Sequence, residues 1–472
     1  MKKLFIDGQW VDTGTYMDVY NPYDGSLVDT ICTATPELTN KAIDAAYAAR
    51  ETMKNLSAAK RGRILDNMCA LIERDKEEIA QIITAEAGKG LVFSRGEAGR
   101  TAENFKFAAD EARRLGGELV PYDASDSGAN RFGYYKRYPI GVIGAITPFN
   151  FPLNLVAHKV GPAIAAGNPI VLKPASTTPL TAVKIVELLL EAGLPACGIN
   201  LVVGSGSVVG NAMVESDKIA MITFTGSPSV GLDIKSKAGI KKVTLELGSN
   251  SAAIIHEDAD IRYAVPKCVI GAFANSGQVC ISIQRIYIHE SRYQEFRDMF
   301  VDAVKASRNG DPKDEKTLVG PMIEEKEAIR AEKWINEAVA MGAKVAVGGK
   351  RTGTLLEATV LEDTNEQMTI VREEIFGPVV CIMKYSTLDE VIDRVNDSQF
   401  GLQAGIFTNN IQNAFKTIDR LEVGGVMVND MPTFRVDQMP YGGVKLSGTG
   451  REGPKFAVEE MTELKTVMFN LN

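Results

Sequence analysis

The sequence predicts an α/β fold made of two domains and a small β-strand extension. A chain of 472 residues is too long for one simple core, which favours two domains with an appendage. From Tyr138 onward, short apolar runs alternate with amphipathic helical stretches, a pattern typical of βαβ units around a parallel sheet. The final TELKTVMFN alternates polar and apolar residues, as an exposed strand would.

The first domain begins with NPYDG, which predicts a turn between two strands. Apolar spacing and good helix formers predict helices within residues 36–74 and 76–115. The expected strands of the parallel sheet cover residues 141–146, 169–173, 199–203, 220–224 and 242–247. Helices are expected to begin near Thr178, Ser207 and Pro228.

Parallel sheets bind ligands beyond the carboxyl ends of their strands. Lys173, Gly226 and Glu246 fall at such ends and are therefore candidates for a binding site. The second block starts near Ser251, where SAAIIH predicts a strand, and residues 261–276 predict the helix that delivers Cys280. Further α/β alternation continues to about Lys445.

Composition excludes several classes of protein. Hydrophobic residues make up 45% and charged residues 24% of the chain, as in ordinary globular proteins. The 60 acidic and 52 basic residues give a net charge of -8, which argues against a nucleic-acid partner. The N-terminus lacks the apolar run of a signal peptide and no stretch reaches the roughly 18 apolar residues of a spanning helix, so the sequence predicts a cytoplasmic protein without a membrane segment.

The six cysteines are scattered without C-x-x-C pairing, and no two of the three histidines have the spacing of metal ligands. We therefore expect neither disulfides nor a catalytic metal.

Three residues supply the groups that chemistry on a carbonyl requires. Cys280 lies in ANSGQVCISIQR, Glu246 in VTLELGSNS and Asn150 in AITPFNFP. Thiol attack on an aldehyde needs a nucleophilic sulfur, a donor for the developing oxyanion and a base that activates water. Plainer interpretations exist: Cys280 as a buried core thiol, Glu246 as an ionic partner of Lys159, and Asn150 as a turn residue.

These three stretches resemble the aldehyde dehydrogenase superfamily, and the resemblance continues in FTGSPSVG, EEIFGPV and PYGGVKLSGTGRE. It covers almost the whole chain. It implies a Rossmann-like NAD(P)-binding domain over residues 1–118 and 140–248, a catalytic domain over 249–445, and a bridging segment over 119–139 and 446–472. The resemblance also implies a homo-oligomer, dimer or tetramer, in which the C-terminal strand pairs across a subunit interface with a segment near residues 121–138.

The resemblance implies NAD or NADP as cofactor. Lys173 matches a lysine that contacts the adenosine ribose, Glu374 a carboxylate on the nicotinamide ribose, and Phe376 should pack beside that ribose. The pyrophosphate is expected at the helix after FTGS, where Gly226 permits close approach and Ser227 opens a positive helix end.

Thr147, Pro148 and Gly204 complete the expected cofactor contacts, although GSGSVVG alone is weak evidence because its spacing is not G-x-G-x-x-G. Many NAD-preferring members carry glutamate three residues after the lysine, where this chain has Ser176. That serine permits NADP and is compatible with NAD.

The expected substrate pocket is rich in basic residues. Arg100, His158 and Arg435 occupy positions that are apolar or aromatic in members with apolar substrates, and Phe151 is expected to line the same pocket. Arg285 is a weaker candidate because it can instead brace the sheet. Singly, each arginine is most simply a solvated side chain; together they favour an anionic or strongly hydrogen-bonding aldehyde, because arginine binds oxyanions through paired N–H donors.

The sequence therefore predicts a hydrolytic dehydrogenase for a short polar aldehyde of the lactaldehyde, sulfolactaldehyde, phosphonoacetaldehyde or glyceraldehyde-phosphate type. A semialdehyde dehydrogenase of the succinate-semialdehyde type is the main alternative. A coenzyme A-acylating enzyme is less favoured because such members commonly lack the glutamate found here at position 246, and a non-catalytic nucleotide-binding protein is disfavoured by the retention of all three chemical groups.

Overall fold

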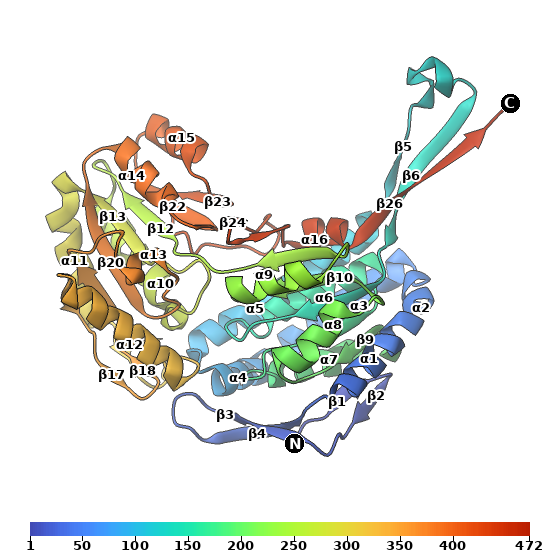
Figure 1. Cartoon of the computed structure of the whole chain (residues 1–472), viewed down its shortest axis with the longest axis horizontal. Coiled ribbons are helices and arrows are strands. Elements are labelled where there is room, and N and C mark those ends of the chain that lie inside the picture. Colours follow the sequence, from blue (N-terminus) through green and yellow to red (C-terminus); the bar gives the residue numbers. More distant parts are fainter.

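The computed structural model describes all 472 residues, which form two α/β units and a projecting β arm (Figure 1). The first unit is built on an eight-stranded sheet in the order β2-β1-β9-β8-β7-β10-β11-β25. Neighbours from β9 to β11 are parallel, whereas β1, β2 and β25 pair antiparallel. The strands of this sheet are β1 (Leu4–Ile6), β2 (Gln9–Val11), β7 (Val142–Ile146), β8 (Ile170–Lys173), β9 (Ile199–Leu201), β10 (Ile219–Thr225), β11 (Lys242–Glu246) and β25 (Gly448–Thr449).

Counted from β7 along the chain, the parallel strands lie in the order 3-2-1-4-5, and the direction of winding reverses between β7 and β10. The Rossmann-like sheet is thus confirmed. In such sheets ligands bind where the strand order reverses, so the ends of β7, β10 and β11 are the expected place for a site.

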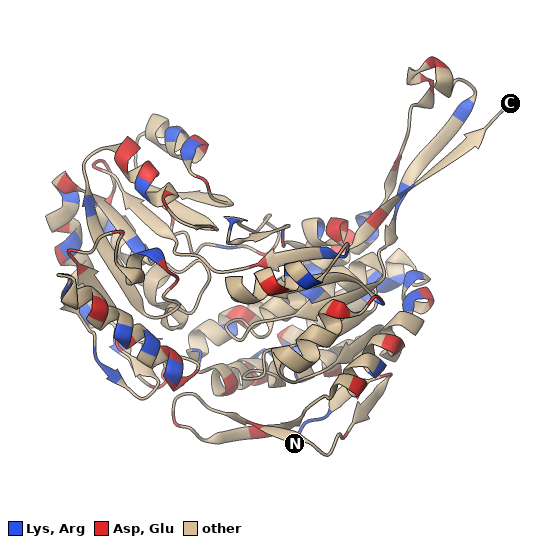
Figure 2. Cartoon of the chain, viewed as in Figure 1, with Lys and Arg blue, Asp and Glu red and all other residues tan.

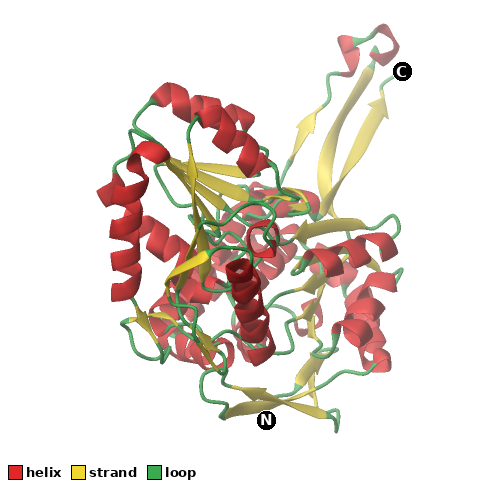
Figure 3. Ribbon diagram, turned by 60° about the vertical axis from the view of Figure 1, so that its left-hand side comes forward, coloured by secondary structure: helices red, strands yellow, loops and turns green.

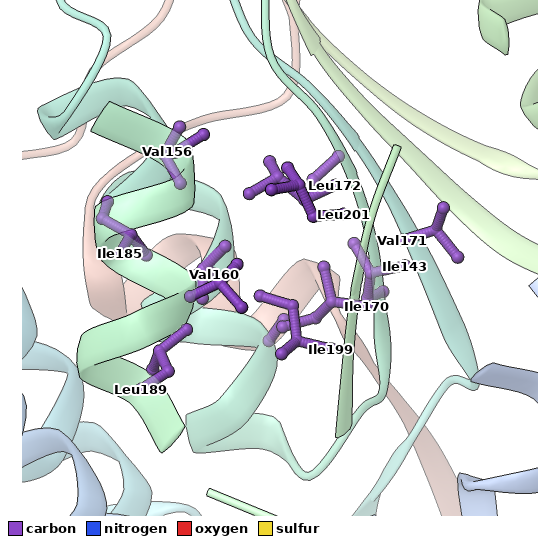
Figure 4. Close-up of a cluster of buried hydrophobic side chains, with 14 of the residues drawn as sticks. Ile143, Val156, Val160, Ile170, Val171, Leu172, Ile185, Leu189, Ile199 and Leu201 are labelled. Carbon is purple, nitrogen blue, oxygen red and sulfur yellow. The ribbon is translucent and has the colours of Figure 1, made fainter. Parts of the chain in front are cut away.

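Helices cover this sheet and bury its apolar side chains. They are α1 (Pro36–Ala48), α2 (Arg50–Lys54), α3 (Ala58–Arg74), α4 (Lys76–Ala87), α5 (Leu91–Arg114), α6 (Asn154–Ala166), α7 (Leu180–Glu191), α8 (Asn211–Glu215), α9 (Pro228–Lys237) and α16 (Pro454–Glu460). All residues of α6 are buried, because α6 packs between the sheet and α5. Figure 4 shows Val160 of α6 and Leu189 of α7 facing Ile170 and Ile199, while Val171 points to the other side of the sheet.

The second unit holds a seven-stranded sheet in the order β16-β19-β20-β13-β12-β22-β23, parallel except for β16. Its strands are β12 (Ala252–Ile255), β13 (Arg285–His289), β16 (Lys344–Val347), β19 (Thr359–Glu362), β20 (Val379–Tyr385), β22 (Gln403–Phe407) and β23 (Gly425–Val428). Its helices are α10 (Ile261–Phe273), α11 (Tyr293–Ala306), α12 (Glu325–Ala340), α13 (Thr369–Arg372), α14 (Leu388–Asn396) and α15 (Ile411–Arg420). The chain passes between the two sheets from β11 to β12.

The arm is a three-stranded antiparallel sheet in the order β26-β6-β5, with the C-terminus at its far end (Figures 1 and 3). Its strands are β5 (Gly117–Leu119), β6 (Arg131–Pro139) and β26 (Thr462–Asn470). The expectation that the C-terminal strand pairs across a subunit interface was wrong. All nine residues of β26 pair with β6 of the same chain, from Thr462 opposite Pro139 to Asn470 opposite Arg131.

Residues 446–472 do not all belong to the arm, because β25 adds to the first sheet and α16 packs against α5 and α6. The predicted turn at NPYDG is confirmed between β3 (Tyr16–Tyr20) and β4 (Leu27–Cys32). None of the helices combines the length and the apolar character that a membrane-spanning helix needs. Figure 2 shows that acidic and basic residues are interspersed along the helices.

Candidate active site

Cys280 is positioned by a chain reversal after α10. The predicted helix over residues 261–276 ends early, at Phe273, because Asn275, Ser276 and Gly277 adopt positive φ angles of 53°, 56° and 67°. A Cβ atom on Gly277 would lie 2.0 Å from the carbonyl oxygen of Gly377, so only glycine fits there. This turn carries Cys280 away from its own sheet to the edge of the first one.

Two cavities meet at Cys280. One has a volume of about 390 Å³ and is lined by residues that follow β7, β10 and β11. The other has a volume of about 350 Å³ and is lined by residues of α5, the Cys280 loop and the segment before Tyr441. Cys280 and Leu155 line both cavities. The sulfur therefore stands where a molecule in one cavity can react with a molecule in the other.

Asn150 lies directly beside the Cys280 loop. Its side-chain Nδ2 donates to the carbonyl oxygen of Gln278 at 2.9 Å, and its own carbonyl accepts from Asn275 Nδ2 at 3.2 Å. The side chain is buried and lines the larger cavity. An amide nitrogen carries two hydrogens, so one remains for an oxyanion that forms next to the sulfur.

Glu246 ends β11 and lines the same cavity. It is buried, and neither carboxyl oxygen has a hydrogen-bond partner. Burial raises the pKa of Glu246 well above its usual value, and the nearby Glu452 carboxylate adds to this effect. The ionic pairing with Lys159 is not formed, because Lys159 Nζ donates to Glu452 at 2.9 Å and to Thr225 at 2.7 Å. An unpaired carboxyl at a cavity wall is available to take a proton from water.

Burial also raises the pKa of the Cys280 thiol, to about 12. Two groups oppose that rise: the hydrogen bond between Cys280 Sγ and the hydroxyl of Tyr441, at 2.8 Å, and the charge of Arg435. Tyr441 was not singled out from the sequence. Its place within the PYGG motif was the available signal.

Several residues expected at the cofactor lie along the larger cavity. Pro148, Gly226, Ser227, Glu374 and Phe376 all line it. Ser227 precedes α9, whose N-terminus faces the cavity. Ser249 N donates to Glu374 at 2.9 Å, and burial raises the pKa of Glu374 to about 7. A Cβ atom on Gly248 would lie 2.1 Å from Glu374, so glycine there leaves room for the carboxylate.

Four further cofactor candidates lie near the strand ends but do not line that cavity. Lys173 is buried, its Nζ donates to the carbonyl of Pro174 at 3.2 Å, and burial lowers its pKa to about 8. Ser176 donates to the carbonyl of Gly204 at 3.0 Å. The hydroxyl of Thr147 is buried without a partner. The bond between Ser176 and Gly204 joins the segments that follow β8 and β9.

Arg100, Phe151 and Arg435 line the smaller cavity as expected, and Lys89 joins them with its ammonium 3.6 Å from the Phe151 ring. Arg435 donates to Glu452 at 3.0 Å, and its Nε is buried without a partner. Arg100 donates to the buried Asp437 carboxylate at 3.1 and 2.8 Å. Each arginine is therefore held by a buried carboxylate while keeping N–H donors that no protein group uses.

The structure does not bring His158 or Arg285 to this cavity. His158 is buried behind Arg435 and hydrogen-bonds Asp437 at 2.8 Å; burial lowers its pKa, so the ring does not add a positive charge. Arg285 begins β13 and its Nε donates to the carbonyl of Asn250 at 2.9 Å, which makes it a brace of the second sheet. The acidic partners Asp437 and Glu452 were missed in the sequence, although they flank the PYGG motif.

The sequence profile of the aldehyde dehydrogenase family matches residues 10–467. The chain belongs to the aldehyde dehydrogenase family. It is an aldehyde-oxidising oxidoreductase. Among curated relatives, the 3-sulfolactaldehyde dehydrogenase of Priestia megaterium is 47% identical over 469 residues, which cover 99% of this chain and 98% of the relative. The lactaldehyde dehydrogenase of Methanococcus aeolicus is 42% identical and is covered over its full length, with 99% of this chain matched.

Solved structures of several family members resemble this chain over nearly its whole length. Aldehyde dehydrogenase 21 of Physcomitrella patens, in complex with the reaction product succinate, has a TM-score of 0.97 at 42% identity, with 99% of this chain and 98% of that chain covered. Glyceraldehyde-3-phosphate dehydrogenase GapN of Methanocaldococcus jannaschii, complexed with NADP, has a TM-score of 0.93 at 42% identity, with 96% and 99% covered. A Staphylococcus aureus betaine aldehyde dehydrogenase in complex with NAD+ has a TM-score of 0.96 at 34% identity, with 100% and 95% covered.

Proposed function

We propose that this chain oxidises a short polar aldehyde to its carboxylate with NAD or NADP as hydride acceptor, through a thiohemiacetal and a thioester on Cys280. The observation that carries the proposal is the position of Cys280 between two cavities, with Asn150 and Glu246 on the wall of one and two arginines on the wall of the other. The nucleotide-binding domain over residues 1–118 and 140–248 and the catalytic domain over 249–445 are part of this proposal.

The larger cavity suits the nicotinamide ribose and the pyrophosphate of a dinucleotide, and the strand ends beside it suit the adenosine ribose. A Cβ atom on Gly226 would lie 2.4 Å from the Phe224 ring, so the packing against that ring requires glycine. The N-terminus of α9, which follows Ser227, would bind a phosphate group of the dinucleotide. Glu374 would hold the nicotinamide ribose, and Lys173 with Ser176 would meet the adenosine ribose. When bound, the oxidised nicotinamide accepts the hydride that leaves the substrate carbon.

The chain's own groups carry the remaining steps. The Cys280 thiolate adds to the carbonyl carbon, and Asn150 Nδ2 together with the Cys280 backbone N–H donates to the oxyanion that forms. When the oxyanion re-forms the carbonyl, hydride departs and a thioester remains on the sulfur. Glu246 then takes a proton from water, the water oxygen bonds to the thioester carbon, and the C–S bond breaks. One aldehyde and one water become one carboxylate, with one hydride and two protons released.

The smaller cavity supports an aldehyde with an anionic end group or a 2-hydroxyl group. Arg100 uses Nε and Nη2 for Asp437, and Arg435 uses Nη2 for Glu452, so each guanidinium keeps N–H donors for a ligand. The names of two relatives, 3-sulfolactaldehyde and lactaldehyde dehydrogenase, point to three-carbon 2-hydroxyaldehydes. We propose this class as substrate, with an anionic end group favoured.

A dicarboxylate semialdehyde is the second candidate. The observation that favours it is the similarity to aldehyde dehydrogenase 21, whose structure holds succinate as reaction product. A carboxylate accepts two N–H donors from arginine as a sulfonate does, so the same cavity suits both groups.

The test is kcat/KM for lactaldehyde, sulfolactaldehyde, succinate semialdehyde and propanal, each with NAD and with NADP, and with and without coenzyme A. We expect turnover without coenzyme A and a preference for an anionic or 2-hydroxy substrate over propanal. Propanal as the best substrate would contradict the proposed class. Cys280→Ala should lose activity by ~10⁴-fold or more, whereas Cys69→Ala, at a partly exposed thiol of α3, should keep it. A Cys280→Ala protein that still reduces the cofactor would refute the mechanism.

We further propose a cytoplasmic homotetramer. Five apolar side chains are exposed on the arm: Leu119, Phe132, Leu464, Met468 and Phe469. Burial of these side chains against another copy of the chain would stabilise an oligomer. Light scattering on the purified protein should give a mass four times the 51.1 kDa of the chain. A measured mass of two chains would show a dimer in place of the proposed tetramer. A measured mass of one chain would contradict the proposed oligomer.

A further inference from the structure

Tyr441 is the one side chain that hydrogen-bonds the Cys280 sulfur. Its hydroxyl lies 2.8 Å from Sγ, and neither atom has another hydrogen-bond partner. Tyr441 is buried and lines the smaller cavity but not the larger one. The hydrogen bond therefore directs the sulfur toward the cavity that we assign to the aldehyde.

The Tyr441 ring is fixed by a closed circuit of contacts. Its backbone pairs with that of Glu452, with N–O distances of 3.1 and 2.7 Å. The Glu452 carboxylate accepts from Arg435 at 3.0 Å, and the Arg435 guanidinium carbon lies 3.6 Å from the centroid of the Tyr441 ring. Glu452 thus binds the Tyr441 backbone and also holds Arg435, which packs on the Tyr441 ring. These contacts fix both ends of Tyr441 and leave its hydroxyl little freedom to move away from the sulfur.

The chemistry of the pair changes when the thiol ionises. A neutral thiol and a phenol can each donate, but a thiolate can only accept, so the phenol must then be the donor. A hydrogen bond to the charged form favours that form, and a positive charge against the ring makes the phenol a stronger donor. Both effects oppose the desolvation that disfavours the thiolate at this buried place.

We propose that Tyr441 is a positioning residue that holds the resting Cys280 sulfur on the aldehyde side and stabilises its thiolate through an O–H···S hydrogen bond. The inference rests on the proposed function, because it takes Cys280 as the nucleophile. When the sulfur bonds to carbon, this hydrogen bond weakens and the phenol is free to donate to a substrate oxygen.

The test measures alkylation of Cys280 by iodoacetamide, without aldehyde or nucleotide, from about pH 6 to about pH 9, with the modified peptide followed by mass spectrometry. Tyr441→Phe lowers the thiolate fraction roughly tenfold for each unit by which the thiol pKa rises. The more basic thiolate is also more nucleophilic, so the net expectation is about a threefold slower reaction per unit at every pH.

Replacement of Tyr441 by 3-fluorotyrosine keeps the shape and gives a more acidic phenol, so alkylation should become faster than in the natural protein. Tyr385→Phe is the matched control, because it removes a buried phenol that hydrogen-bonds His256 at 2.7 Å in the second unit. Its Cys280 alkylation should not change. An equal or faster reaction in Tyr441→Phe, or no effect of fluorination, overturns the inference.

The same samples separate this inference from the proposed function. If Cys280 is the nucleophile, its alkylation abolishes dehydrogenase activity in every variant, whatever the role of Tyr441. Alkylated protein that remains fully active would instead refute the proposed function.

Discussion

Arg100 and Asp437 form a two-point ion pair across 337 positions of sequence, with Arg100 Nε and Nη2 donating to the carboxylate at 3.1 and 2.8 Å. Asp437 also accepts from Asn154 at 3.0 Å and shares a hydrogen bond of 2.8 Å with His158. Burial would raise its pKa, but the hydrogen bond with His158 and the Arg100 charge outweigh burial and hold the pKa well below the usual range. Asp437 therefore stays ionised and orients Arg100 at neutral pH.

Arg100→Ala and Arg435→Ala should each raise KM for anionic aldehydes by roughly 10- to 100-fold, because each removes hydrogen bonds to a charged group. KM for propanal should change far less. Steady-state kinetics with both substrates checks this, with Lys54→Ala, an exposed lysine of α2, as control. If the substitutions raised KM for anionic aldehydes and KM for propanal equally, this result would contradict an anion-binding role of the smaller cavity.

Glu246→Gln should leave the first hydride transfer intact and slow release of the acyl group, with kcat lower by about 10²- to 10⁴-fold. Rapid mixing should then show a burst of one reduced cofactor per active site, followed by a slow phase. The thioester should be visible by mass spectrometry. Glu187→Gln, at an exposed position of α7, serves as control, and loss of the burst in Glu246→Gln would assign the residue to an earlier step.

The raised pKa of Glu246 should make the rate of thioester hydrolysis depend on pH. Below that pKa the carboxyl is neutral and accepts no proton, so hydrolysis of the thioester should accelerate as pH rises through it. The Glu246→Gln enzyme should lack this rise. A natural enzyme whose acyl-release rate falls with rising pH over the same range would argue against Glu246 as the base.

Glu374 should make cofactor binding pH-dependent. Its pKa of about 7 means that the carboxylate, the better acceptor for ribose hydroxyls, forms only as pH rises through neutrality. KM for the nicotinamide cofactor should therefore fall between about pH 6 and about pH 8. Glu374→Gln should flatten this profile, and an unchanged profile in the variant would place the titrating group elsewhere.

Ser176→Glu tests the cofactor preference. A carboxylate beside the adenosine ribose would repel a 2′-phosphate, so KM for NADP should rise at least ~10-fold while KM for NAD stays within a factor of about three. Ser176→Ala is the control without charge. If both cofactors lose affinity equally in Ser176→Glu, the residue does not face the 2′ position.

The sequence was sufficient for the parts of the site that lie within single motifs. Asn150, Glu246 and Cys280 meet because β7, β10 and β11 are neighbours in the sheet and a glycine-dependent turn follows α10. Local patterns of apolar residues predicted the strands that end before Asn150 and near Glu246, and the helix that precedes Cys280, although this helix ends at Phe273 and not at Ser276.

Contacts between distant segments could not be predicted in the same way. Asp437 and Glu452 decide how Arg100 and Arg435 are held, and no local pattern pairs residues so far apart along the chain. His158 looked like a pocket residue by position, but α6 is buried on all sides. The alternation of polar and apolar residues predicted strand β26. Such alternation indicates which face of a strand is apolar but not which strand it pairs with, and the partner is β6 of the same chain.

The shared thiol has a consequence for inhibitor design. A compound that fills the larger cavity, beside Glu374, and a compound that fills the smaller cavity, beside Arg100, would each reach the Cys280 sulfur. A reactive electrophilic group attached to either compound would therefore modify the same residue, Cys280. The two compounds would compete for this residue, although Leu155 and Cys280 are the only residues that line both cavities.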